Sequence, residues 1–545
     1  MFSTQTIAAA EDVLGVRYTE AERAFMLDNL AGQIELAKRR RATPLPLDLA
    51  PATRFDPRLP GFVLPATPSR VSTPAGPGRL PDTAEDICFA PVTSLSGWIR
   101  SRAITAERLA GLYLDRIARL GPKLECIATT TADFAMEQAR RADALLARGT
   151  YLGPLHGIPW GCKDLLDTTG ILTGWGAEPY AERVPATDAT VVQRLSAAGA
   201  VLVAKLTLGA LAYGDIWYGG ITRNPWNTNE GSSGSSAGSG SATAAGLVAF
   251  SLGTETLGSI VAPSLRCGVT GLRPTFGRVP RTGAMPLCWT LDKIGPMCRS
   301  VADTALVLAA INGGDPADPC SIDAPFGFDA SAPIAGLRLG YYPADFAEAG
   351  VDDLDRAVLD HARELGLTLV ELKRPDLPYD ALMNVLFAEA AASFEHLTLE
   401  DTDDRLTWQK AGSWPNTFRK ARFLSAVDHI QLDRLRRRIM QDMDRTFAEV
   451  DAIVGPCLAG PMLIVTNFTG HPCVALRCGF RQSPTRKALS LAEAKLDQGE
   501  EGGGESFTVP HALSLYGRLF DESTILCIGA ALEFRLDVAS RRPPL

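Results

Sequence analysis

Apolar residues recur at helical spacing in the first forty residues of the chain. A helix brings every third or fourth position onto one face, and the basic run at 38–41 closes the pattern. Prolines recur from Pro44 to Pro81, which predicts an extended strap rather than a folded domain. We therefore expect residues 1–82 to form an amino-terminal arm that packs on the rest of the chain or on a second subunit. The apolar positions of its helical part are Met26, Leu27, Leu30, Ile34 and Ala37.

From about Thr83 onward, predicted helices alternate with predicted strands. Thr105 is placed to cap a helix that ends at Gly121 and Pro122, and the β-branched run at 126–131 predicts a strand. Asp188 is the expected cap of the next clear helix, which is followed by a short buried strand at 201–205. This alternation is typical of an α/β fold whose sheet is covered by helices on both faces. With no convincing internal boundary, residues 83–545 are predicted to form one domain.

Composition excludes several classes of protein. The chain has 545 residues, of which 46% are hydrophobic, so it can bury a large core. Its net charge of -8 gives no footprint for nucleic acid or for an anionic membrane surface. No stretch reaches the roughly 18 apolar residues of a spanning helix, and the first residues lack the pattern of a secretion signal, so we expect a soluble, cytoplasmic protein without membrane contact.

The remaining compositional signals predict no special chemistry. Eleven cysteines lie at scattered positions without metal-ligand spacing, which indicates free thiols and no metal site. The low-complexity segment at 498–505 is expected to be a surface loop.

Lys163 is the first candidate catalytic residue. It lies in the segment GIPWGCKDLLDT, whose apolar residues would bury the amine and lower its pKa, and a neutral amine can act as a base. The alternative is a structural lysine paired with Asp164 or Asp167. A second alternative makes Cys162 a nucleophile with His156 as its partner, although His156 is more readily structural.

Two serines complete the candidate chemistry. Residues 231–246 read GSSGSSAGSGSATAAG, in which Ser235 is placed to relay a proton. An apolar run and then GTETLGSI follow, ending in a second candidate at Ser259. The backbone N–H groups of Thr256, Leu257 and Gly258 would converge near Ser259 as an oxyanion hole. The alternative for the first segment is a flexible Gly/Ser linker.

A competing interpretation uses Ser236. Gly234, Ser236 and Gly238 satisfy G-x-S-x-G, the nucleophile elbow of α/β-hydrolases, but that turn must follow a buried strand. The preceding RNPWNTNEGSS is polar and contains a proline, which argues against a strand. The histidines available as bases would be His361, His396, His429, His471 and His511.

These stretches together resemble the amidase signature family. The resemblance covers roughly residues 85–540 and is densest from 150 to 312. It rests on GPLHGIP with Lys163, the DATVVQRLSAAGAVLVAK segment, the RNPW turn, the Gly/Ser segment, GTETLGSI, CGVTGLRPTFGRV and DKIGPM. The family resemblance implies the amidase-signature fold, with a large, mixed and twisted β-sheet.

Carried over by position, the resemblance implies a Ser–cisSer–Lys triad. Lys163 would be the base, Ser235 the bridging serine after a cis peptide bond with Gly234, and Ser259 the nucleophile that forms an acyl-enzyme. The 24-residue separation of Ser235 and Ser259 matches the family's spacing. Ser236 would orient the segment, and neither a metal nor an organic cofactor is implied.

Two positions depart from the family pattern. Leu257 replaces the first of two glycines that usually precede the nucleophile, and Val261 replaces an arginine. We expect Leu257 to narrow the turn around Ser259. Arg266 is the candidate to replace the missing arginine as the partner of Glu255.

The leading functional hypothesis is a stand-alone amidase that hydrolyses a linear amide bond of a small molecule, with a homodimer as the candidate assembly. Alternatives are a carbamate or ester hydrolase of the same fold, and the glutaminase-type subunit of a tRNA-dependent amidotransferase. Aromatic residues near the Gly/Ser segment would line a substrate pocket, although core packing explains them as well. They are Tyr213, Trp217, Tyr218 and Trp289.

Overall fold

The computed structural model describes residues 3–66, 68–73, 76–348, 350–486 and 505–545. The segment at 498–505 predicted as a loop lies outside the described residues, apart from Glu505. Within the described residues, no helix is both long and apolar enough to cross a membrane.

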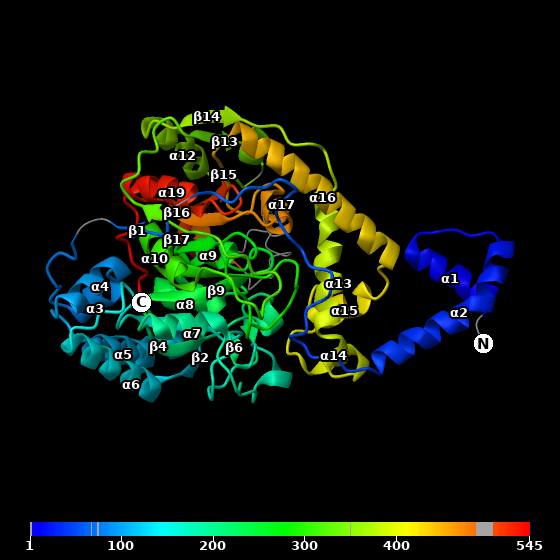
Figure 1. The fold of residues 1–545 in the computed structure, drawn as a ribbon, viewed down its shortest axis with the longest axis horizontal. Coiled ribbons are helices and arrows are strands. Elements are labelled where there is room, and N and C mark those ends of the chain that lie inside the picture. Colours follow the sequence, from blue (N-terminus) through cyan, green and yellow to red (C-terminus); the bar gives the residue numbers. More distant parts are fainter. Residues whose placement is uncertain (1–2, 67, 74–75, 349, 487–504) are drawn as a thin grey trace.

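One large mixed sheet organises the body of the molecule (Figure 1). In the described residues it has eleven strands, in the order β14-β13-β15-β17-β16-β10-β11-β9-β3-β4-β2. Parallel pairs such as β3–β9 occur beside antiparallel pairs such as β9–β11. The predicted α/β class, with a mixed sheet covered by helices on both faces, is confirmed. The sheet strands are β2 (Ile127–Thr130), β3 (Pro159–Lys163), β4 (Val201–Leu206), β9 (Phe250–Glu255), β10 (Thr270–Arg273), β11 (Lys293–Cys298), β13 (Arg338–Tyr341), β14 (Thr368–Glu371), β15 (Ala452–Pro456), β16 (Cys473–Pro484) and β17 (Ser506–Gly517).

Short two-stranded ribbons lie outside the main sheet. They are formed by β1 (Val71–Ser72) with β12 (Phe328–Asp329), β5 (Ile216–Trp217) with β6 (Gly220–Ile221), and β7 (Arg223–Asn224) with β8 (Asn227–Gly231). The last ribbon corrects the expectation that the segment before the Gly/Ser residues contains no strand. Its polar residues form a strand because β8 pairs locally with β7 rather than entering the apolar sheet.

Helices pack on the sheet through their apolar faces. For example, α5 and α6 contact β4, while α19 contacts β16 and β17. The helices of the body are α3 (Ala84–Phe89), α4 (Val92–Arg100), α5 (Ala106–Leu124), α6 (Ala132–Ala147), α7 (Thr190–Ala197), α8 (Ala237–Ala244), α9 (Val261–Cys267), α10 (Val301–Ile311), α11 (Pro343–Phe346), α12 (Asp353–Glu364), α13 (Met383–Ser393), α14 (Glu395–Leu399), α15 (Trp414–Ala421), α16 (Ala426–Glu449), α17 (Met462–Thr469) and α19 (Glu522–Leu536).

Two predicted helix ends are wrong, for local reasons. Thr105 caps α5 as expected, but the helix continues past Pro122 and ends where Glu125 adopts a left-handed conformation with φ of 48°. Asp188 does not cap α7, whose first flanking residue is Ala189. The Asp188 carboxylate instead accepts a hydrogen bond from the backbone N–H of Thr169, at 2.6 Å.

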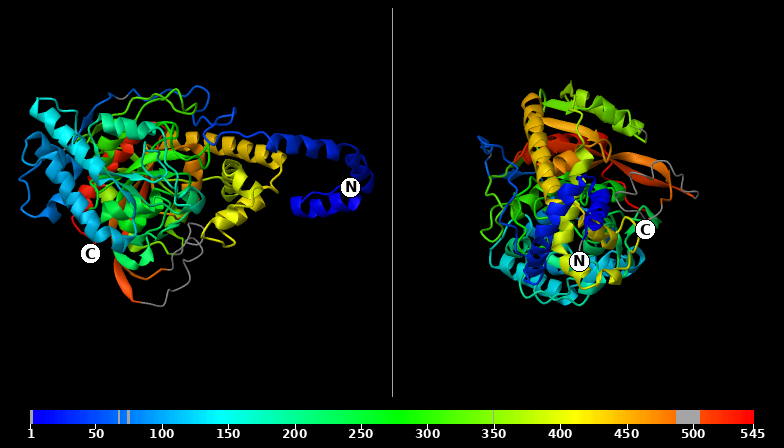
Figure 2. Two further views of the ribbon diagram at one scale, coloured as in Figure 1. Left: turned by 90° about the horizontal axis from the view of Figure 1, so that it is seen from below. Right: turned by 90° about the vertical axis from the view of Figure 1, so that its right-hand side faces the viewer.

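The amino-terminal residues project from one end of the body (Figure 2). Most of residues 4–41 are helical, as the apolar spacing predicted. They form α1 (Thr4–Leu14) and α2 (Glu20–Arg41), separated by a turn at Gly15. Arg40 of α2 forms an ion pair with Glu395 of α14, at 2.5 Å. The segment from Pro44 to Pro81 then returns along the body without a helix in its described residues.

Candidate active site

Lys163 ends the central strand β3 and is fully buried. Its Nζ atom lies 2.9 Å from Ser235 Oγ, 3.0 Å from Ser236 Oγ and 2.8 Å from Thr254 Oγ1. Burial lowers the pKa of Lys163 well below its usual range, while the carboxylates of Asp292 and Glu255 act in the opposite direction. The desolvated amine among hydroxyl groups is therefore suited to the neutral state that a base requires.

The alternative that Lys163 pairs with a neighbouring carboxylate is wrong. Asp164 lies 3.7 Å from the ammonium group of the buried Lys205. Asp167 forms two hydrogen bonds with the Arg183 guanidinium group, each at 2.7 Å. Both carboxylates therefore balance other cations, and Lys163 contacts hydroxyl groups instead.

Ser235 follows a cis peptide bond with Gly234, as the family resemblance predicted. A glycine is needed at 234 because a Cβ atom there would lie 1.8 Å from the backbone oxygen of Gly214. The Gly/Ser segment is not a flexible linker: residues 231–246 are buried, and α8 begins directly after Ser236. The small side chains allow this helix to approach the sheet closely.

Ser259 lies four residues beyond the end of β9 and is 7% exposed. Gly258 before it has φ of 78°, a conformation that favours glycine. The backbone oxygen of Ser259 accepts a hydrogen bond from the N–H of Ser236, at 3.1 Å, which fixes the two segments together. The Ser259 hydroxyl forms no hydrogen bond with another described residue, so the Lys163–Ser235 contact is formed here and a Ser235–Ser259 hydrogen bond is not.

A buried carboxylate supports the turn that carries Ser259. Glu255 accepts hydrogen bonds from the backbone N–H groups of Ile260 and Val261, at 2.8 and 3.0 Å. Its cationic partner is Arg273 of β10, at 2.7 Å, with both side chains fully buried. The prediction that Arg266 takes this place is wrong, because Arg266 lies beside Glu230 at 3.6 Å.

The nucleophile elbow at Ser236 is contradicted by the partners of its hydroxyl group. Ser236 Oγ donates to the backbone oxygen of Thr254, at 3.1 Å, and receives hydrogen bonds from Lys163 and from the N–H of Thr254. Among the described residues, none of the five candidate histidines contacts it; His511, for instance, contacts Asp355.

The Cys162 alternative fails for a related reason. Burial raises the pKa of this thiol to about 11, which disfavours the reactive thiolate. His156 contacts the backbone of Ala142 and Leu152 instead of Cys162, which confirms its structural role.

A comparison with protein families matches residues 108–478 to the family described as Amidase, which is more than half of the chain. The chain belongs to the amidase family. The A subunit of a glutamyl-tRNA(Gln) amidotransferase from Chloroflexus aggregans is 33% identical over 508 residues, covering 84% of this chain and 99% of that protein.

Solved structures of amidases have the same fold. The peptide amidase from Stenotrophomonas maltophilia is 27% identical, with a TM-score of 0.70, and covers 84% of this chain and 98% of its own. A bacterial aryl acylamidase of the amidase signature family is 20% identical, with a TM-score of 0.70 over 84% of this chain and 100% of its own, and supports the fold alone.

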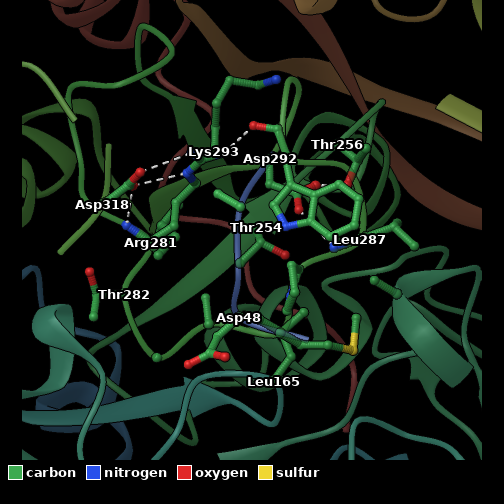
Figure 3. A pocket seen from close by; sticks show the side chains of 18 of the residues that line it. Asp48, Leu165, Thr254, Thr256, Arg281, Thr282, Leu287, Asp292, Lys293 and Asp318 are labelled. Carbon is green, nitrogen blue, oxygen red and sulfur yellow. Dashed lines mark hydrogen bonds and ion pairs between the residues drawn. The ribbon is translucent and has the colours of Figure 1, made fainter. Parts of the chain in front are cut away.

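In this amidase a cavity of about 200 Å³ borders the Lys163 group through Thr254 and Thr256 (Figure 3). Thr256 Oγ1 donates to Asp292 at 2.6 Å, so the cavity wall and the Ser259 turn share one hydrogen-bond network. The apolar part of the lining includes Leu165, Met285, Pro286, Leu287, Trp289 and Ile294.

The predicted aromatic pocket residues separate into two groups. Trp289 lines the cavity, as does Thr254. Tyr213, Trp217 and Tyr218 are not among its lining residues: the Tyr213 ring stacks 5.2 Å from that of Trp408, and Trp217 and Tyr218 pack edge-to-face. Aromatic residue type alone does not distinguish these two environments.

Thr254 is the principal site residue that the sequence analysis missed. Its hydroxyl accepts the shortest of the hydrogen bonds from the Lys163 amine, and its backbone contacts Ser236. The available signal was its position in GTETLGSI, five residues before Ser259. Only the parallel pairing of β3 with β9 brings that position beside Lys163.

Among the described residues, one group of three side chains places metal-ligating atoms within 4.8 Å of one another, and it consists of Asp355, Cys478 and His511. None of these residues contacts the Lys163 group. The Lys163 amine lies within 3.0 Å of three hydroxyl groups, and a neutral amine can donate two hydrogen bonds and accept one, so these contacts leave its lone pair available to a hydroxyl proton.

Proposed function

We propose that this amidase hydrolyses the linear amide bond of a small molecule through Lys163, Ser235 and Ser259, with an acyl-enzyme intermediate. The observation that carries the proposal is the 2.9 Å contact between the buried Lys163 amine and Ser235 Oγ. A neutral amine beside a hydroxyl group is an activated proton acceptor, and a relay through that hydroxyl extends its reach to a second serine.

The proposed reaction uses these three residues as a proton relay. Neutral Lys163 takes the proton of Ser235, Ser235 takes that of Ser259, and the Ser259 oxygen bonds to the substrate carbonyl carbon. The proton returns through the relay to the leaving nitrogen as the carbon–nitrogen bond breaks. Water then attacks the acyl-enzyme by the same route, so that one amide and one water give one carboxylic acid and one amine.

The backbone N–H groups of Thr256, Leu257 and Gly258 are the proposed donors to the oxyanion. The left-handed conformation of Gly258 and the Glu255 hydrogen bonds after Ser259 both support a tight turn at this point. Preorganised donors of this kind stabilise the charge that develops on the carbonyl oxygen. We propose that the Leu257 side chain restricts the size of the acyl group.

A glutamine-hydrolysing subunit of an amidotransferase is the second candidate, favoured by the name of the 33% identical relative. Glutamine carries an α-carboxylate that needs a cationic partner. Of the two cations that line the described cavity, Arg281 is bonded to Asp318 and to the Trp289 backbone, and burial lowers the pKa of Lys293 to about 7, which weakens it as a partner for a carboxylate. This arrangement supports the small-molecule amidase.

The remaining expectations stay predictions. We infer that residues 1–82 form an arm on a catalytic domain of residues 83–545, that the protein is cytoplasmic, and that the projecting α1–α2 hairpin contacts the body or a second copy in a homodimer.

A substrate panel tests the proposed function. The purified chain alone is expected to hydrolyse aryl and aliphatic amides faster than matched carbamates and esters, and to release ammonia from glutamine slowly. The measurement is initial rate by chromatography of the acid and amine products. Faster turnover of esters or carbamates would favour the alternative leaving groups, and glutamine as the preferred substrate would favour the second candidate.

The pH dependence of turnover tests the base. Because burial lowers the pKa of Lys163, the neutral amine becomes dominant at a pH well below that of an ordinary lysine, near 10.4. We therefore expect kcat/KM for an uncharged amide to rise with pH and to level off well below pH 10. The control variant Lys123→Met changes an exposed lysine, and we expect its pH profile to match that of the unchanged chain. A rising limb centred near pH 10 would contradict a desolvated base.

A further inference from the structure

The amino-terminal strap forms part of the wall of the candidate substrate cavity. Asp48 and Ala50 line this cavity, together with Thr254 and Thr256 from the catalytic side (Figure 3). A segment distant in sequence from the Lys163 group thus faces the space that a substrate would occupy.

Contacts on both sides of Asp48 hold the strap in place. Leu47 packs against the hydrophobic core. Phe55 packs edge-to-face with Phe276, with ring centroids 5.1 Å apart, and the Arg436 guanidinium group lies 3.4 Å from the centroid of the Phe55 ring. Asp48 is therefore positioned by anchored neighbours on both sides.

The strap also contacts another part of the cavity lining. Arg54 donates to the backbone oxygen of Pro319, at 2.5 Å. Pro319 is itself a lining residue, next to Asp318, which bonds to Arg281. The hydrogen bond from Arg54 therefore connects the strap to the lining residues Asp318 and Pro319.

Asp48 carries a charge without a partner among the described residues. The other two lining carboxylates are engaged, Asp318 with Arg281 and Asp292 with Thr256 and two backbone N–H groups. Asp48 has no hydrogen bond or ion pair with a described residue, and Figure 3 draws its carboxylate beside the cavity without a contact line. Among the described lining residues, Asp48 is therefore the carboxylate without a partner, whereas Arg281 is paired with Asp318 and burial lowers the pKa of Lys293.

We propose that Asp48 makes the strap a specificity element, which selects substrates with an ammonium group at one end of an apolar body. The inference rests on the proposed function and names its substrate class. The apolar body would lie against Leu287 and Trp289, and the ammonium group would approach the Asp48 carboxylate. An anionic group at the same end would be repelled.

Equilibrium binding tests this inference independently of turnover. The probes are 2-phenylethylammonium, the neutral 2-phenylethanol and the anionic 3-phenylpropanoate, titrated into the full chain and followed by ligand-observed NMR. Exposed ion pairs are weak, so we expect the ammonium probe to bind about fivefold more tightly than the alcohol, with the anion weakest. Raising the ionic strength should reduce the difference.

Asp48→Asn is expected to remove the preference for the ammonium probe and to leave binding of the alcohol unchanged. The matched control is Asp82→Asn, an exposed carboxylate of the same amino-terminal segment that does not line this cavity. Equal binding of the three probes to the unchanged chain, no binding of any probe, or an equal loss for all three in Asp48→Asn would overturn the inference.

Kinetics separate this inference from the proposed function. With an ammonium-bearing amide, Asp48→Asn should raise KM about fivefold at unchanged kcat, because the contact is the same in the ground and transition states. If neutral amides are hydrolysed and no ammonium preference exists, the specificity inference fails alone. If the ammonium preference in binding is found without amide turnover, the proposed function fails alone.

Discussion

Lys163→Met is expected to lower kcat/KM by about 10⁴-fold, the largest effect of any single change at the site. Methionine matches the length of the lysine stem but offers no amine to Ser235, Ser236 or Thr254. The side chain stays apolar in a fully buried position, so the fold should persist. The measurements are steady-state kinetics on the best amide of the panel and thermal unfolding.

The exposed control Lys123→Met should retain full activity and the same unfolding midpoint. Substantial turnover by Lys163→Met would remove the amine from the mechanism. If Lys163→Met loses both its activity and its folded state, Lys163→Arg tests the role of the amine instead. Arginine keeps a charged side chain that cannot serve as a neutral base, so a folded but inactive Lys163→Arg would support the mechanism.

Arg273→Met is expected to lower the free energy of unfolding by about 3–5 kcal/mol. Both side chains of the Arg273–Glu255 ion pair are fully buried in the unchanged chain. The substitution therefore leaves the Glu255 carboxylate buried without its cation. Removing both charges in Arg273→Met/Glu255→Gln should recover part of the loss, because no unpaired charge then remains. Chemical denaturation of the two variants measures the difference, and a double variant as unstable as the single one would contradict this account.

The contribution of the same ion pair to the free energy of unfolding decreases at low pH. Arg273 holds the pKa of Glu255 at about 2 against the effect of burial, below the usual value near 4.3. Its contribution to stability is therefore present above pH 4.3 and is lost as the pH falls toward 2. Arg273→Met should flatten this part of the stability profile. As a control, Arg79→Met removes the partner of Asp82 at the surface and should change neither stability nor its pH dependence measurably.

Sequence patterns predicted the elements of this fold where apolar periodicity and caps were local. The strand at 201–205, the Thr105 cap and the amino-terminal helices all follow from neighbouring residues. The helix α8 was not predicted, because its Ser and Gly residues have low helix propensity. Tertiary packing overrides propensity there: a Cβ atom at Gly238 would lie 2.5 Å from the Thr207 backbone nitrogen, so only small residues fit.

The site residues that belong to sequence motifs could be predicted from the spacing of those motifs. Lys163 and Ser235 meet as the family resemblance implied, and the cis bond at Gly234 is present. Thr254 and Arg273 were missed because their contacts depend on strand order, which places β9 beside β3 and puts β10 two strands from β9. No local pattern contains that order. The role of Ser259 as nucleophile remains a prediction.

Residues of α17 form hydrogen bonds with both members of the Glu255–Arg273 ion pair. Asn467 donates to Glu255 at 2.9 Å, and Arg273 donates to Thr466 and to the backbone of His471. During translation Lys163 and Ser259 leave the ribosome long before Thr466, Asn467 and His471. A nascent chain therefore cannot complete the contacts that support the Ser259 turn until α17 has emerged.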